Sequence, residues 1–214
     1  MPITSDQPAS YHCPNCGAEL PLRFRYAKMA VCEHCGSTLF LEDDGMRLAG
    51  TRSVLAAMPS LIQLGQGFSY DTQDYLPVGH LRYRYKLGFW DEWWILDRNG
   101  DGLWLSVDEG DFVFEQPLQP ERLPATPLPG FKQLQLNRSV RLLEQDWTVT
   151  ERDRGHCEGF RGQLPARVTE GESFFYAHLS GPDASLLTLE YPQDGSVNVS
   201  RGYWVDPFEI RIRT

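Results

Sequence analysis

The sequence is short of lysine and rich in acidic residues, which excludes one broad class of function. Only Lys28, Lys86 and Lys132 are lysines, and the 20 basic residues face 29 acidic ones, for a formal net charge of −9. The basic residues are mostly arginines, spread along the chain rather than clustered. Binding to nucleic-acid phosphates needs clustered Lys and Arg, so this composition argues against a general nucleic-acid-binding protein.

Long hydrophobic runs are also missing. A membrane-spanning helix needs about 20 consecutive apolar residues, and no stretch approaches that length. The first residues, MPITSDQPASYHC, have neither a basic segment nor an apolar segment of the kind that precedes secretion. The sequence therefore predicts no transmembrane segment, no secretory signal and a cytoplasmic location.

Cysteine is scarce, yet four of the five cysteines follow a clear pattern. Cys13 and Cys16 lie in CPNCG, and Cys32 and Cys35 lie in CEHCG fifteen residues later. Each Cys-x-x-Cys turn directs two thiolates at one metal, and two turns complete a closed tetrahedral shell. Residues 1–45 are therefore predicted to be a zinc ribbon that holds one structural Zn²⁺, rather than a disulfide framework.

The neighbours of these cysteines have simpler interpretations. With four sulfur ligands present, His12 and His34 are expected to lie beside the metal rather than to bind it. The alternating stretch LPLRFRY, residues 20–26, and the stretch TLFLE, residues 38–42, are predicted strands. The only basic residues of the ribbon are Arg23, Arg25 and Lys28.

After the ribbon the pattern is that of an all-β chain. Residues 47–64 can hold one short helix, interrupted by Pro59. Between residues 117 and 130 lie five prolines, which exclude a central strand and indicate a stiff connection. Predicted strands, separated by turns every eight to twelve residues, are 78–85, 93–96, 103–107, 112–116, 173–179, 185–191, 196–200 and 209–213.

The segments on either side of this connection look like degenerate copies. Gly79-His80-Leu81 corresponds to Gly162-Gln163-Leu164, and LWL at 103–105 corresponds to LTL at 187–189 at almost the same offset. The predicted fold is therefore mainly β. A zinc ribbon precedes two small antiparallel modules of the β-barrel or sandwich type, at residues 60–116 and 131–214.

Several short motifs resemble a known family by their order. They are Gly65-x-Gly67, Tyr75-x-x-Val78-Gly79-x-Leu81, Trp90-Asp91-Glu92-Trp93, Trp104-Leu105 and Arg201-Gly202-Tyr203-Trp204. Together with the ribbon they resemble the bacterial domain family catalogued as domain of unknown function 4178 (DUF4178), over roughly residues 60 to 206. This resemblance implies no established activity, so it supplies no catalytic residues.

The sequence contains no recognisable catalytic constellation. It has neither a phosphate-binding Gly-rich loop nor a dinucleotide fingerprint. Cys157 follows His156, but neighbours on a strand point to opposite faces, so an ordinary free cysteine is expected. His80 is in phase with arginines and is predicted to be exposed, and His178 shows no metal-binding pattern. Asp91 and Glu92 are interpreted as turn or edge residues.

Two features of residues 89–111 have more than one interpretation. Trp90, Trp93, Trp94 and Trp104 either fill the core or form a binding platform, and the sequence leaves both open. The stretch from Asp97 to Asp108 matches the ligand positions of an EF-hand loop, but its flanks read as strands instead of helices. We therefore predict a hairpin turn there rather than a calcium site.

Three functions are compatible with these observations. The first is a non-enzymatic zinc-binding adaptor that contacts partner proteins. The second is a small-ligand-binding protein or enzyme whose site lies between the two modules and involves Asp91, Glu92, Arg82 or His156. The third and weakest is nucleic-acid binding through Arg23, Arg25 and Lys28.

Overall fold

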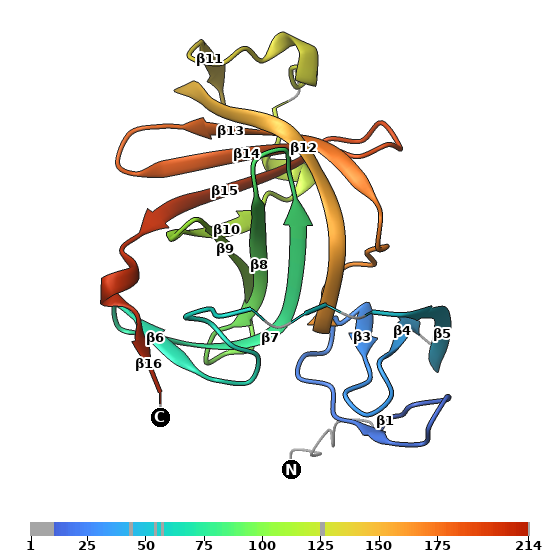
Figure 1. Ribbon diagram of the computed structural model, residues 1–214. Helices are drawn as coiled ribbons and strands as arrows, with labels where there is room; N and C mark the ends of the chain where they lie inside the picture. Colours follow the sequence, from blue (N-terminus) through green and yellow to red (C-terminus); the bar gives the residue numbers. More distant parts are fainter. Residues whose placement is uncertain (1–10, 43–44, 54, 57, 125–126, 214) are drawn as a thin grey trace, which may run out of the picture.

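Antiparallel strands make up most of the computed structural model, which describes residues 11–42, 45–53, 55–56, 58–124 and 127–213 (Figure 1). This confirms the mainly β prediction. The strands are β1 (Tyr11–His12), β2 (Glu19–Leu20), β3 (Met29–Val31), β4 (Ser37–Glu42), β5 (Gly45–Arg52), β6 (Phe68–Tyr70), β7 (Gln73–Arg84), β8 (Phe89–Leu96), β9 (Gly102–Asp108), β10 (Asp111–Pro117), β11 (Ser139–Leu142), β12 (Gln145–Leu164), β13 (Ser173–Ser180), β14 (Ser185–Tyr191), β15 (Asn198–Val205) and β16 (Arg211–Ile212).

Short 3₁₀ turns complete the described elements: η1 (Pro120–Arg122), η2 (Phe131–Gln133) and η3 (Pro207–Glu209). The first of these lies in the proline-rich connection, whose described residues after Pro117 form no strand, as predicted. In the part of the chain that the structure describes, no helix combines the length and apolar character needed to cross a membrane.

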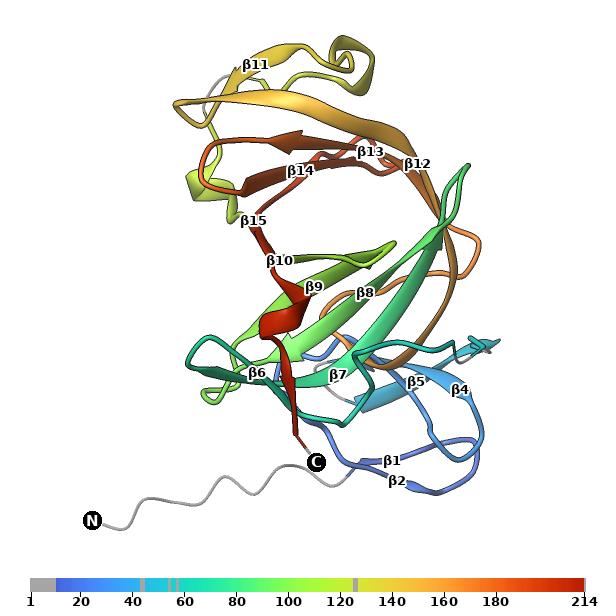
Figure 2. The ribbon, with the colours of Figure 1, turned by 60° about the vertical axis from the view of Figure 1, so that its left-hand side comes forward.

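Eight of the described strands pair in a closed circuit. From β7 the pairing runs through β8, β9 and β10 to β15, then back through β14, β13 and β12 to β7. Residues 60–116 and 131–214 each contribute four consecutive strands, which agrees with the internal repeat seen in the sequence. Figure 2 shows the two quartets facing each other. The division into separate modules at these boundaries stays a prediction about folding units.

The two quartets pair with each other at β10–β15 and at β7–β12. The β7–β12 pairing depends on a pair of glycines. Gly79 and Gly162, matched as repeat equivalents in the sequence, are direct cross-strand partners between β7 and β12. A Cβ on Gly79 would lie 2.2 Å from the Gln163 carbonyl oxygen, and one on Gly162 would lie 2.3 Å from the Val78 carbonyl oxygen. Gly162 also has φ +73°, which L-residues rarely adopt. The strands can approach this closely only because neither position has a side chain.

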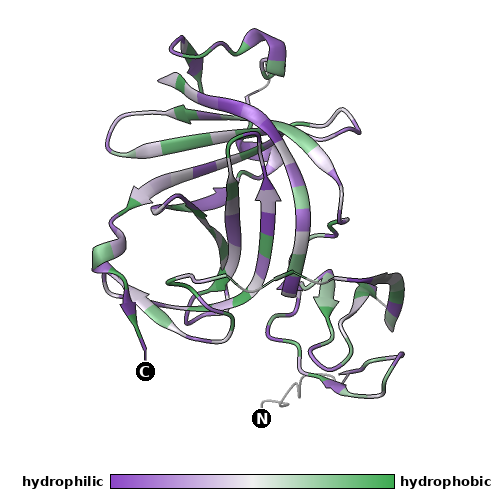
Figure 3. Ribbon diagram, viewed as in Figure 1, coloured by the Kyte–Doolittle hydropathy of each residue, from purple (hydrophilic) through white to green (hydrophobic). Residues whose placement is uncertain are grey.

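Apolar side chains on the outer faces of the two quartets form two of the cores. Hydropathy changes repeatedly along the strands in Figure 3, as expected for strands with two different faces. In the first quartet, Trp93, Ile95, Leu105 and Phe114 pack with Phe68 of β6 and neighbouring residues. In the second quartet, the corresponding cluster contains Trp147, Val149, Leu179, Leu187 and Leu189.

The N-terminal ribbon is joined to the circuit by strand pairing and by a shared core. β3 pairs with the end of β12, at Met29–Leu164 and Ala30–Gln163. Phe24, Met29 and Leu41 pack in one cluster with Leu81, Trp94 and Phe160 of the circuit. Burial of this much apolar surface makes the ribbon part of the same packed body.

Two elements predicted from the sequence are wrong. Residues 21–26 form no strand, because Pro21 and Arg23 bond to the side chain of Gln163 and Phe24 turns into the shared core. Residues 47–52 are strand rather than helix because they pair with β4, and no helix follows in the described residues up to 64. Ser53 then ties this segment to β12 through hydrogen bonds with both the carbonyl oxygen and the amide of Phe160.

Candidate ligand cavity and metal site

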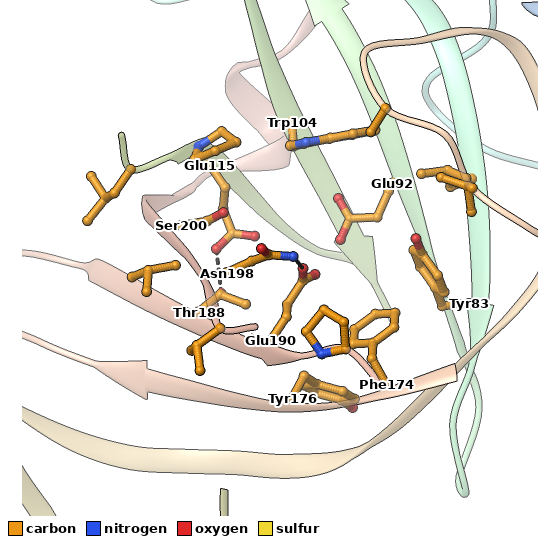
Figure 4. Close-up of a pocket in the computed structure, with 18 of the residues that line it drawn as sticks. Tyr83, Glu92, Trp104, Glu115, Phe174, Tyr176, Thr188, Glu190, Asn198 and Ser200 are labelled. Carbon is orange, nitrogen blue, oxygen red and sulfur yellow. Dashed lines mark hydrogen bonds between the residues drawn. The ribbon is translucent and has the colours of Figure 1, made fainter. Parts of the chain in front are cut away.

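A cavity of about 460 Å³ lies inside the circuit, and all eight strands contribute side chains to its lining. The proline-rich connection adds Pro117, Leu118 and Pro120, and the β12–β13 connection adds residues 166–168. Part of the wall therefore comes from the segment that the sequence marked only as a stiff link. Figure 4 shows the labelled side chains converging from opposing strands.

The lining follows the two-residue repeat of β-strands. On β8, Trp90 and Glu92 face the cavity, whereas Asp91 and Trp93 between and beside them point to the other face. On β13, Phe174, Tyr176 and His178 face inward. Because successive side chains alternate between faces, β8 and β13 each supply every second residue to the cavity.

Three glutamates bring carboxyl groups into this space. Glu92 and Glu115 come from the first quartet and Glu190 from the second. Trp90 Nε1 donates to Glu92 at 2.9 Å, Thr188 Oγ1 to Glu115 at 2.5 Å, and Asn198 Nδ2 to Glu190 at 3.4 Å. Among the described residues, none of the three carboxylates has a basic side chain in ion-pair contact.

The pKa values of these three groups are shifted in the same direction. Burial raises the pKa of Glu190 to about 7. Burial, together with the charges of Glu115 and Glu190, raises the pKa of Glu92 well above its usual value. The pKa of Glu115 is also raised by burial. Without a basic partner in contact, burial disfavours the charged form of these carboxyls.

Both basic side chains in the lining are bound to other acids. His178 Nδ1 lies 3.0 Å from Glu151 Oε2, and Tyr176 donates to Oε1 of the same carboxylate at 2.6 Å. Burial lowers the pKa of His178, but the bond to Glu151 outweighs it, so the net shift is upward. At the rim, Arg167 lies 3.0 Å from Glu42 and over the ring of Phe40. No basic side chain of the lining is therefore left to pair with the three buried glutamates.

The polar residues predicted to form a site between the modules are only partly brought together. Glu92 lies in the cavity, but Asp91 and Arg82 face away from it, and His156 is exposed outside it. Arg82 forms two hydrogen bonds to Asp91, at 2.8 and 3.0 Å. Asp91 is therefore a partner of a buried arginine, not a member of the cavity lining.

His80 belongs to the same buried network, so the prediction that it is exposed is wrong. It is 1% exposed, stacks on Trp93 at 4.0 Å between ring centroids, and contacts Asp91 through Nε2 at 2.8 Å. Arg161 contacts its other ring nitrogen at 2.9 Å. Burial lowers the pKa of His80 despite the neighbouring carboxylate. Strand alternation correctly placed His80 on the face of β7 opposite Leu81. That face is buried because other parts of the chain cover it.

The four tryptophans divide between core and cavity. Trp93 and Trp94 are buried in the outer and shared cores, respectively. Trp90 and Trp104 line the cavity. Strand alternation separates Trp93 from Trp94, whereas position along β8 separates Trp94 in the shared core from Trp90 in the cavity.

Cys157 lies on β12 and lines the cavity, 1% exposed. Burial raises the pKa of its thiol to about 12, so the reactive thiolate is disfavoured at neutral pH. This agrees with the ordinary, unreactive cysteine expected from the sequence.

The remaining four cysteines form a compact cluster. The sulfurs of Cys13, Cys16, Cys32 and Cys35 all lie within 4.8 Å of one another. Two of the Sγ–Sγ distances, Cys13–Cys35 and Cys16–Cys32, are 3.7 Å. Tetrahedral ligands at about 2.3 Å from zinc are about 3.8 Å apart, so the cluster suits one metal ion. Asn15 supports it by donating to Cys35 Sγ at 3.5 Å.

The EF-hand-like stretch is the hairpin between β8 and β9, as predicted. Asp97 Oδ1 accepts hydrogen bonds from the amides of Asn99 and Asp101, at 2.8 and 2.9 Å. Gly100 provides the positive φ of the turn. Gly102 instead leaves room for the Trp94 ring, since a Cβ there would lie 2.0 Å from it. The carboxylate of Asp97 stabilises the turn's own backbone.

Sequence reasoning missed Glu115, Glu190 and Tyr176 as candidate site residues. Each lies in an ordinary-looking strand, FVFEQ, SLLTLEY or SFFYAHL. The only signal in the sequence was that each of these polar or amphipathic residues occupies one particular face of its predicted strand. Only the pairing of the strands shows that these positions face one space.

Comparison with known proteins yields one match. Residues 63–207 match the family described as "Domain of unknown function (DUF4178)". No curated protein and no solved structure matches the chain.

Proposed function

Since the chain belongs to the DUF4178 family, whose description carries no activity, we propose a function from geometry: it is a small-molecule-binding protein whose ligand occupies the cavity inside the eight-stranded circuit. The observation that carries this proposal is a cavity of about 460 Å³ with side chains from every strand of the circuit. Ligand pockets typically have volumes of about 300–1,000 Å³ and combine apolar walls with a few convergent polar groups.

The zinc ribbon has a structural role in this proposal. Cys13, Cys16, Cys32 and Cys35 hold one Zn²⁺ in a closed shell, which leaves no position for a reacting water. The supporting observation is the spacing of their sulfurs, all within 4.8 Å. Zinc-bound thiolates also agree with the cytoplasmic location predicted from the sequence, because a reducing compartment keeps thiols unpaired.

A cavity-filling substitution tests the proposed site. Ser200 lines the cavity, so Ser200→Trp should occupy it, whereas Ser139→Trp places the same side chain at an exposed position on β11. We expect a fragment screen by ligand-observed NMR to yield mutually competing hits on wild type and Ser139→Trp, and loss of those hits on Ser200→Trp. Hits that persist in a folded Ser200→Trp variant would place binding elsewhere and overturn the proposal.

A protein-interaction role is the second candidate. It is supported by exposed aromatic side chains near the C-terminus, where Phe208 is 86% and Trp204 is 38% exposed. Large aromatic side chains are enriched at the centres of protein interfaces. Crosslinking in native cells, compared between wild type and Phe208→Ser, tests this role. Nucleic-acid binding through Arg23, Arg25 and Lys28 stays the weakest prediction, given the net charge of −9.

A further inference from the structure

We propose that the ligand of this cavity is an organic cation, a small molecule with one or more ammonium or guanidinium groups on an apolar frame. This inference rests on the proposed function, since it names the chemical class that the same cavity accepts. It is carried by the unbalanced carboxyl groups, by an unused oxygen on a buried glutamate, and by the aromatic walls around them.

The most specific observation concerns Glu115. It is 6% exposed, and its Oε1 accepts the hydrogen bond from Thr188, whereas Oε2 has no hydrogen-bond partner among the described residues. Figure 4 shows its carboxyl group pointing into the space that Glu92 and Glu190 also face. An oxygen that faces the cavity without a donor from the protein can accept a hydrogen bond from a ligand.

The lining is acidic in composition. It contains four carboxyl groups and two basic side chains, and the basic ones are held by Glu151 and Glu42. Tyr83, Tyr176 and Cys157 are neutral at physiological pH. A positively charged ligand would therefore supply what the protein lacks here. The titratable lining residues are Tyr83, Glu92, Glu115, Cys157, Arg167, Glu172, Tyr176, His178 and Glu190.

The walls favour an organic cation over a hydrated one. Tyr83 and Trp90 stack at 5.0 Å between ring centroids, and Tyr176 lies 5.0 Å from Trp90. Trp104 and Phe174 complete an aromatic lining around the glutamates. The faces of such rings attract ammonium and guanidinium groups, and their apolar area packs against hydrocarbon.

A metal ion fits this cavity less well. Among the described residues, only the four cysteines bring ligand atoms close enough together to hold one metal ion. The three glutamates therefore do not converge on a single small point charge. They are arranged for a ligand with several atoms between its polar ends.

Three six-carbon probes of matched shape separate charge from size: hexane-1,6-diammonium, hexane-1,6-diol and hexanedioate. By isothermal titration calorimetry on the full-length zinc-loaded protein at pH 7.5, we expect the diammonium ion to bind at least tenfold more tightly than the diol. Hexanedioate should not bind. Calcium chloride is the fourth probe, and glutamate-dependent binding of calcium in place of the diammonium ion would overturn the inference.

Charge-removing variants locate the binding. Glu115→Gln and, independently, Glu92→Gln should each weaken diammonium binding at least tenfold without changing the affinity for the diol. Glu144→Gln, at an exposed position, should change neither. A melting curve shows whether each variant folds. If one of the two does not fold, the other still provides the test.

The outcomes distinguish this inference from the proposed function. If the diol binds as tightly as the diammonium ion and Ser200→Trp abolishes both, the cavity binds ligands but has no preference for cations, so the inference alone fails. If the diammonium ion does not bind at all, or still binds to Ser200→Trp, the inference also fails. If the fragment screen yields no cavity-dependent hits either, the proposed function fails with it.

Discussion

Two glycines allow the halves of this protein to approach each other closely. Gly79 and Gly162 face each other where β7 meets β12, and a Cβ on either would lie within 2.3 Å of a carbonyl oxygen. Those oxygens belong to the backbone of the neighbouring strand, which cannot move aside as a flexible side chain could. The joint is therefore far less tolerant of a side chain than an ordinary turn.

At the residue scale, Gly162→Ala should destabilise the protein more than Gly195→Ala. Both glycines have positive φ, +73° and +84°, but only at Gly162 does a Cβ meet other atoms. The φ alone costs about 1–2 kcal/mol for an L-residue, and overpacking adds roughly 1–3 kcal/mol. Urea unfolding of the two variants measures the difference. An equal loss of unfolding free energy in both variants would show that the close contact with β7 adds nothing to the destabilisation.

At the scale of the elements, the ribbon and β12 depend on each other. The ribbon contributes β3 to the end of β12 and Phe24 to the core that holds Trp94. Phe24 and Tyr26 lie 6.3 and 6.4 Å from Trp94 between ring centroids. A change in the ribbon therefore reaches a tryptophan of the circuit through direct packing.

Removal of the metal should be detected at that tryptophan. We expect Cys32→Ser, or treatment with a strong chelator, to remove one zinc ion per chain, lower the melting temperature and change the tryptophan fluorescence. The reason is that closed zinc sites contribute directly to folding free energy. Metal analysis, thermal melting and emission spectra provide the three readouts.

Cys157→Ser is the matched control, because this buried cysteine lies in the cavity and away from the cluster. It should retain the metal. A freshly purified wild-type protein without metal, or a Cys32→Ser variant that melts and fluoresces as wild type does, would contradict the structural role of the ribbon.

At the scale of the whole molecule, closure of the circuit sets the chemistry of the cavity. Glu92 and Glu115 belong to one half and Glu190 to the other, so all three carboxyls face one space only when the circuit is closed. The upward pKa shifts follow from burial first, and for Glu92 and Glu190 also from charges across the cavity.

These shifts predict a pH dependence of stability in the absence of ligand. A raised carboxyl pKa means that the folded protein holds a proton that the unfolded chain releases above about 4.5. The contribution of Glu190 is thus complete at acid pH and is lost as pH rises through its pKa of about 7. By linkage this loss amounts to at most about 3 kcal/mol.

Glu190→Gln should remove that part of the slope, and Glu144→Gln, at an exposed position, should not. Urea unfolding at pH 5, 6, 7 and 8 measures it. Relative to wild type, Glu190→Gln should become more stable as the pH rises. Parallel pH profiles for wild type and Glu190→Gln would show that this carboxyl is already ionised in the folded state at pH 5.

The sequence alone determined the features that depend on neighbours along the chain. The Cys-x-x-Cys spacing sets the geometry of a metal knuckle within a few residues, and alternation of polar and apolar residues identifies most strands. Asn99-Gly100 determines a hairpin turn, in which the Asp97 carboxylate accepts hydrogen bonds from the amides of Asn99 and Asp101. Each of these depends on local dihedral angles and short side-chain contacts.

Only the tertiary structure decided which strand face meets which environment. Alternation separates His80 from Leu81 but does not tell that the polar face of β7 is covered and buried, while the opposite face borders a cavity. The same limit hid Glu115 and Glu190, and Glu190 meets the other two only through the pairing of β15 with β10. A period of two specifies two faces, and the long-range pairing of strands decides what each of them contacts.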